Sequence, residues 1–71
     1  MDQVVHDVLD ALERQDWAAL RPLLHPYLHW SDAATRLRGR TNVLEHLAES
    51  PPPGPPRVYE LRDGQIYRWS S

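Results

Sequence analysis

The sequence contains no cysteine and no lysine, and it has no long hydrophobic run. The absence of cysteine excludes disulfides and thiolate metal sites and suits a reducing compartment, so we expect a cytoplasmic location. No apolar stretch approaches the ~20 residues that a membrane-spanning helix needs, so we expect no membrane association. The N-terminal residues quickly become acidic and amphipathic, which is unlike a secretory signal peptide.

Length and net charge are also small. The chain has 71 residues, with eight arginines against ten acidic residues and a net charge of −2. This balance argues against a general nucleic-acid binder. The length allows a single domain, residues 1–71, whose core rarely supplies more than about 3–5 kcal/mol. We therefore expect a further source of stability.

Hydrophobic periodicity predicts three helices. Residues 3–14 place valines and leucines on one half of a helical wheel and mostly charged residues on the other. Asp16 is the expected N-cap of a second helix, in which Pro22 predicts a kink or a break. A third apolar-periodic segment follows Thr41, which we expect to cap it.

Alternation and turn residues predict the strands. "YLHWS" (27–31) and "TRLRG" (35–39) alternate in polarity, and the proline-rich stretch 51–56 is typical of a stiff linker. Asp63-Gly64 is a strong two-residue turn signal inside an expected hairpin over residues 57–69. The sequence therefore predicts an α+β fold, with N-terminal helices packed on one face of a short, curved, mainly antiparallel sheet.

Four segments in this order carry a resemblance: "ALERQDWAAL", "LLHPYLHW", "LRGRTNVLEHL" and "YELRDGQIYRW". Over residues 3–69 the chain resembles the nuclear transport factor 2-like superfamily, which includes polyketide-cyclase-like and ketosteroid-isomerase-like proteins. The resemblance implies a sheet that closes like a cone around an apolar pocket. Members are usually longer, so we expect a shortened chain with a truncated cone. The fold hosts many enzymes and also binding modules, so it does not select a function.

The resemblance implies that Asp32 occupies the position of a general base. Alternation places Asp32 on the same strand face as Leu28 and Trp30, where a partly desolvated carboxylate suits proton transfer. The alternative is that Asp32 begins the turn "SDAAT" and accepts backbone hydrogen bonds. We expect Trp17, Leu28, Trp30 and Asp32 to line a pocket for a small apolar molecule.

The same resemblance argues against steroid isomerisation. It places an oxyanion-donating tyrosine near Val8 and its acidic partner near Val58, and both positions hold valine. Without these donors the chain lacks stabilisation of the oxyanion, which is usually the largest contribution to catalysis. We therefore favour a binding protein over an enzyme and expect no cofactor.

Two other polar groups need an interpretation. His25 and His29 are four residues apart in an extended segment, where that spacing does not bring two ligands together, so we expect no metal site. Arg36, Arg38 and Arg40 form a basic stripe on one strand face. The stripe either binds an anion or guards the edge of a sheet with charge.

Several functions stay open at this point. One is a pocket that binds a small molecule, non-catalytic or with Asp32 as the base of an isomerase-like or cyclase-like enzyme. Another is a protein-interaction module that uses the sheet face. We also expect a homodimer formed through the sheet, because the hairpin places large side chains on both faces whether or not its register slips by one residue at a bulge. Members of the superfamily commonly dimerise in this way. Its interface candidates are Tyr59, Tyr67 and Trp69.

Overall fold

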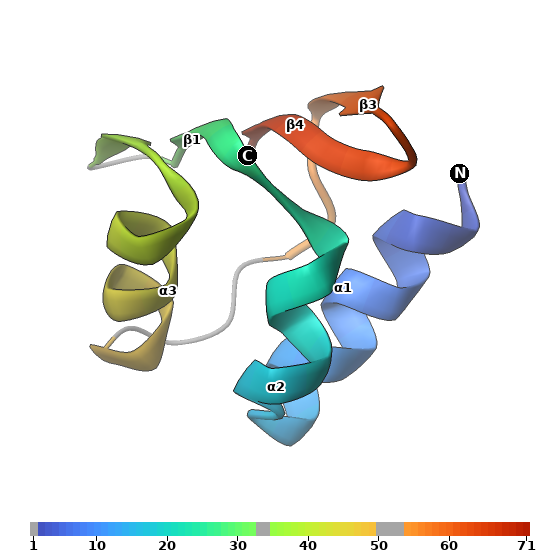
Figure 1. The fold of residues 1–71 in the computed structure, drawn as a ribbon, viewed down its shortest axis with the longest axis vertical. Coiled ribbons are helices and arrows are strands. Elements are labelled where there is room, and N and C mark those ends of the chain that lie inside the picture. Colours follow the sequence, from blue (N-terminus) through green and yellow to red (C-terminus); the bar gives the residue numbers. More distant parts are fainter. Residues whose placement is uncertain (1, 33–34, 50–53) are drawn as a thin grey trace.

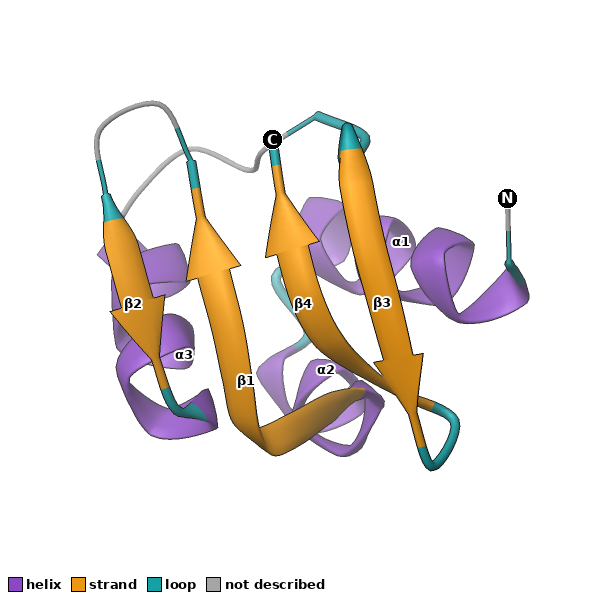
Figure 2. Cartoon of the chain, turned by 90° about the horizontal axis from the view of Figure 1, so that it is seen from above, coloured by secondary structure: helices purple, strands orange, loops and turns teal. Residues whose placement is uncertain are grey.

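The structure is a computed structural model that describes residues 2–32, 35–49 and 54–71. A four-stranded sheet carries the helices on one face and leaves the other face open (Figures 1 and 2). This confirms the predicted α+β architecture. The elements in chain order are α1 (Gln3–Arg14), α2 (Trp17–Leu20), the 3-10 helix η1 (Arg21–Leu23), β1 (Leu24–Ser31), β2 (Arg36–Arg38), α3 (Arg40–Glu49), β3 (Val58–Arg62) and β4 (Gln65–Ser70).

The sheet has the strand order β2-β1-β4-β3. β1 is antiparallel to β2, and β3 is antiparallel to β4. The two central strands, β1 and β4, are parallel and join the two halves of the chain. The sheet is therefore mixed, with β2 and β3 as its edge strands.

Local sequence accounts for most helix ends. The Asp16 side chain accepts a hydrogen bond from the Ala19 N–H at 3.1 Å and so caps α2. Pro22 has no N–H to continue the α-helix, and α2 gives way to η1 as expected.

The expected Thr41 cap is wrong, because α3 already begins at Arg40. Gly39 precedes the helix with a φ of +89°, and its carbonyl accepts from the Val43 N–H at 3.1 Å. Glycine tolerates this left-handed turn, which brings the chain out of β2 and into α3 two residues earlier than a Thr41 cap would.

The hairpin forms where the sequence predicts it. Asp63 and Gly64 both have positive φ, +54° and +76°, which is the backbone of a type I′ turn. Leu61 pairs with Ile66, but the next pair is Glu60 with Arg68. Tyr67 is therefore the extra residue of a β-bulge, and every later residue of β4 changes face relative to an unbulged register.

β1 is also irregular. Leu24 pairs with Ile66, and the next pair is His29 with Arg68. An advance of five residues along β1 therefore corresponds to an advance of only two residues along β4. Figure 2 shows the corresponding sharp bend near the start of β1. Pro26 lies inside the bend, where its missing N–H costs no ladder hydrogen bond.

The core lies between the sheet and the helices. At its centre the indoles of Trp30 and Trp69 stack with ring centroids 5.1 Å apart and planes 5° from parallel. Trp30 belongs to β1 and Trp69 to β4, and the two indoles meet because these residues pair across the parallel ladder. The fully or almost fully buried side chains are Val5, Val8, Ala11, Leu12, Leu20, Leu24, Leu28, Trp30, Val43, Leu47, Ile66 and Trp69.

Among the described helices, none is long and apolar enough to cross a membrane. The predicted proline linker, residues 51–56, falls partly outside the described residues, because positions 51–53 are not described. The extent of the single domain stays a prediction.

Candidate functional site

The open face of the sheet carries two cross-strand rows of side chains. The first row runs over β2, β1, β4 and β3 as Arg38, His29, Arg68 and Glu60. The second row runs in the same strand order as Arg36, Ser31, Ser70 and Val58. Alternation explains the rows, because these residues neighbour inward-facing ones such as Trp30 and Trp69.

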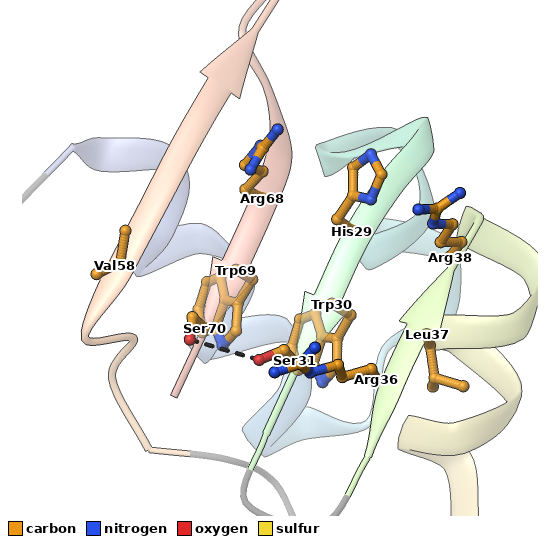
Figure 3. A pocket seen from close by; sticks show the side chains of 10 residues that line it. All are labelled: His29, Trp30, Ser31, Arg36, Leu37, Arg38, Val58, Arg68, Trp69 and Ser70. Atoms are coloured by element: carbon orange, nitrogen blue, oxygen red, sulfur yellow. Dashed lines mark hydrogen bonds between the residues drawn. The ribbon is translucent and has the colours of Figure 1, made fainter.

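A hollow of about 700 Å³ lies over these rows (Figure 3). The buried residues that border it form its floor, since their side chains point into the core. The hydroxyl oxygens of Ser31 and Ser70, which both line the hollow, are 3.5 Å apart. The lining residues are His29, Trp30, Ser31, Arg36, Leu37, Arg38, Val58, Arg68, Trp69 and Ser70.

Positive charge is concentrated on the sheet. Its strands contain four arginines and one glutamate, a net charge of +3. The rest of a chain whose net charge is −2 therefore carries −5. The sequence as a whole is weakly acidic, and only the fold brings the basic residues of the strands together in one sheet.

The arginines of the open face differ in how far neighbouring groups offset their positive charge. Arg68 and Glu60 are 3.6 Å apart and both more than half exposed, a geometry that contributes little net attraction. Arg62 lies over the Tyr67 ring at 4.1 Å. Within the described part of the chain, Arg36 and Arg38 form no ion pair.

Asp32 lies at the end of β1, on the side of the helices. Its Oδ2 is 3.0 Å from Nε2 of His46 in α3, and both side chains are 24% exposed. Its N–H donates to the Thr35 carbonyl at 2.9 Å, and its carbonyl accepts from the Thr35 N–H at 3.4 Å. Sequence analysis missed His46, because no local signal links a helix residue to a strand end.

A second hollow, of about 580 Å³, lies beside α3 and is bordered by His46. It brings the imidazole near the carboxylates of Glu45 and Glu49, which are exposed. Its lining residues are Leu37, Asn42, Glu45, His46, Ala48 and Glu49.

Neither of these two hollows is lined by all four residues that were predicted to line an apolar pocket. Leu28 and Trp30 are buried in the core, and Trp17 packs half-buried against it. Trp30 borders the hollow on the open face, which neither Trp17 nor Asp32 lines. The reason is packing, because the stacked indoles occupy the space between sheet and helices.

Two of the three dimer-interface candidates are not on the open face. Trp69 is 1% exposed and lies in the core. Tyr59 faces the helices, and its hydroxyl donates to the Asp2 carboxylate at 2.9 Å. Both placements follow from the β-bulge, which pairs Tyr59 with Trp69. Tyr67 is on the open face.

The histidines and the arginine stripe also take definite places. The rings of His25 and His29 pack edge-on against Tyr67, with centroids 5.1 and 5.5 Å away. In the described ranges no three side chains with metal-binding groups gather. Arg40 leaves the stripe, because it begins α3 and donates to the Leu24 carbonyl at 3.5 Å.

No protein-family model matches the sequence, and no curated protein matches it. A solved structure does match: a Kribbella flavida DSM 17836 protein described as a "putative ketosteroid isomerase". The TM-score is 0.77 at 16% identity, over 94% of this chain and 72% of that protein. The chain has the nuclear transport factor 2-like fold. At this identity the likeness concerns the fold alone.

Within this nuclear transport factor 2-like fold, the two positions implied for oxyanion donors can now be located. Val8 is buried in the core on α1, and Val58 is 64% exposed on the open face of β3. These two positions therefore lie on opposite faces of the sheet. Neither position supplies a polar group to an interior site.

Proposed function

We propose that the chain is a non-catalytic binding domain that holds a small polar molecule in the hollow on the open face of its sheet. The observation that carries this proposal is that stacked Trp30 and Trp69 fill the interior, while the hollow lies on the opposite face. Its volume of about 700 Å³ falls within the range of about 300–1,000 Å³ that is typical of ligand sites.

The chemistry of this hollow favours binding over catalysis. Arginine stays protonated and acts only as a hydrogen-bond donor, so Arg36, Arg38 and Arg68 cannot take a proton from a substrate. His29 also lines the hollow, and its ring packs edge-on against Tyr67. Asp32, which the resemblance implies as a base, is held by His46 on the other side of the sheet. We therefore assign the open face to recognition of a ligand.

A fragment screen followed by backbone amide NMR tests this proposal. We expect polar fragments to shift amide signals of residues 29–31, 36–38 and 68–70, which border the hollow. Ser31→Tyr places a bulky ring at a residue that lines the hollow and should abolish these shifts. Ala18→Tyr adds the same ring at an exposed position of α2 and should leave them unchanged. If no fragment moves these amides, or if Ser31→Tyr binds as the wild type does, the proposal is wrong.

The Asp32–His46 pair supports a second candidate function, acid–base catalysis at the hollow beside α3. A carboxylate 3.0 Å from an imidazole nitrogen orients the ring, which makes His46 the base and Asp32 its positioning residue. Exchange of ketone α-protons in D₂O, followed by NMR, discriminates the two functions. For a binding domain we expect equal rates for wild type, Asp32→Asn and buffer. Faster exchange with the wild type than in buffer would favour the enzyme, provided that both Asp32→Asn and His46→Gln abolish the increase in rate.

A further inference from the structure

We infer that the hollow on the open face recognises an organic oxyanion, a carboxylate or phosphate group, through Arg36, Arg38 and Arg68. This inference rests on the proposed function, because it names the ligand class for the same hollow. It is carried by the two cross-strand rows, by the uncompensated charge and by the position of Arg68 in the middle of the sheet.

The first row places an arginine on each side of His29. Arg38 and Arg68 flank His29 on neighbouring strands, so their backbones are about 10 Å apart across two strand spacings. Figure 3 shows these three side chains in line across β4, β1 and β2, with Ser31 and Ser70 beside them. Arginine side chains are long enough to converge on a group held above His29, and the serine hydroxyls add short donors.

The positive charge of this surface is not compensated by acidic side chains within the described part of the chain. Arg36 and Arg38 form no ion pair there, and Glu60 is the one acidic residue of the four strands. Glu60 is 3.6 Å from Arg68 in an exposed pair, which an incoming anion displaces at little cost. Guanidinium groups bind carboxylate and phosphate through paired, charge-assisted hydrogen bonds.

Protection of a sheet edge explains only part of this pattern. β2 is an edge strand, where charged side chains discourage pairing with another sheet, and this accounts for Arg36 and Arg38. β4 is a central strand with neighbours on both sides, so Arg68 has no edge to guard. A ligand explains all three arginines and also the hollow between them.

Three matched probes test the inference on the wild-type protein, without any substitution. Benzoate, phenyl phosphate and neutral benzamide share one aromatic ring and differ in charge. At about 0.15 M salt, where the Debye length is about 8 Å, we expect benzoate or phenyl phosphate to shift the amides of residues 29–31, 36–38 and 68–70. We expect benzamide to bind at least about tenfold more weakly, as the loss of charge-assisted hydrogen bonds predicts. Tighter binding of phenyl phosphate than of benzoate assigns a phosphate ligand, and the reverse assigns a carboxylate.

Variants then test which arginines are involved. The double variant Arg36→Gln/Arg38→Gln should weaken binding of the anionic probe about tenfold. Arg62→Gln removes one equal charge from the same face, at a side chain that packs on Tyr67 outside the hollow, and should change binding less than about twofold. The double variant removes two charges and Arg62→Gln removes one. If Arg62→Gln causes half or more of the loss in binding free energy that the double variant causes, the attraction is general, and the inference is overturned.

The two proposals fail in different ways. Equal binding of benzamide and benzoate at these amides would overturn the oxyanion assignment but leave the proposed function intact. No shift with any of the three probes overturns the oxyanion inference. The proposed function falls with it only when the wider fragment screen also finds nothing on this face.

Discussion

At the scale of residues, the stacked pair of Trp30 and Trp69 decides both the core and the site. Each indole is buried, and each indole N–H has no hydrogen-bond partner among the residues that the structure describes. A buried donor without a partner costs about 1–3 kcal/mol. The pair therefore contributes a large apolar area while carrying a polar penalty that phenylalanine would not carry.

This predicts different outcomes for two substitutions of Trp30. Trp30→Ala removes the stack and leaves a cavity, so we expect a loss of about 3–5 kcal/mol in the free energy of unfolding. Trp30→Phe leaves a smaller cavity and removes the unpartnered N–H, so we expect a loss below about 1.5 kcal/mol. Urea denaturation followed by circular dichroism measures both. A loss well above about 1.5 kcal/mol for Trp30→Phe would contradict the argument from the unpartnered N–H.

Asp32 and His46 form the other residue-scale contact with a testable energy. Their hydrogen bond at 3.0 Å joins the end of β1 to α3, and both side chains are partly buried. We expect a double-mutant cycle with Asp32→Ala and His46→Ala to give a coupling of about 0.5–1.5 kcal/mol in unfolding free energy. Additive effects of the two substitutions would mean that the contact contributes nothing.

At the scale of elements, the hairpin of β3 and β4 sets which side chains reach the open face. The type I′ turn at Asp63-Gly64 starts the pairing, and the bulge at Tyr67 then reverses the facing of the rest of β4. Arg68 and Ser70 therefore face the hollow, and Trp69 faces the core. The candidate site depends on this one extra residue.

Substitutions at two glycines, Gly64 in the turn and Gly54 before β3, distinguish the effect of backbone strain from the effect of the space available to a side chain. A methyl group at Gly64 meets no atom within 4 Å, but its φ of +76° disfavours alanine. We expect Gly64→Ala to reduce the unfolding free energy by about 1–2 kcal/mol. Gly54 is the matched control, because it has equal space and no positive φ. Gly54→Ala should be neutral or stabilise by up to about 1 kcal/mol in the same urea titration. Equal effects at both positions would contradict the strain argument.

At the scale of the whole molecule, the fold concentrates positive charge on the sheet. The sheet carries +3 and the remainder −5, so the open face attracts anions although the net charge of the protein is −2. This face also exposes apolar groups, with Tyr27 75% and Val58 64% exposed. Attraction between apolar side chains and repulsion between arginines therefore act on the same surface.

For the predicted homodimer through this face, we expect a dependence on salt. A two-fold dimer would bring the arginines of both copies together, and salt screens that repulsion. We expect sedimentation equilibrium to give a mass near 8.3 kDa at about 0.01 M NaCl and a clearly higher mass at about 1 M NaCl. Tyr67→Ser should reduce the association at high salt. A mass of one chain at both salt concentrations would contradict the dimer.

The sequence by itself determined the features that depend on neighbouring residues. The apolar stripe of residues 3–14, the Asp16 cap, the break at Pro22 and the Asp63-Gly64 turn all formed as predicted. Each rests on contacts within about one helical turn or on the φ of single residues, which local sequence specifies directly. Together these local features were enough to predict the fold class.

Tertiary structure alone decided the candidate site. Arg68 joins Arg38 and His29 only because β4 pairs in parallel with β1, and Trp69 turns inward only because of the bulge. His46 meets Asp32 across 14 residues of sequence. Strand pairing and register follow from how the whole core packs, and a shift of one residue reverses every side chain. Short-range patterns therefore predicted the elements but not which of their side chains would meet.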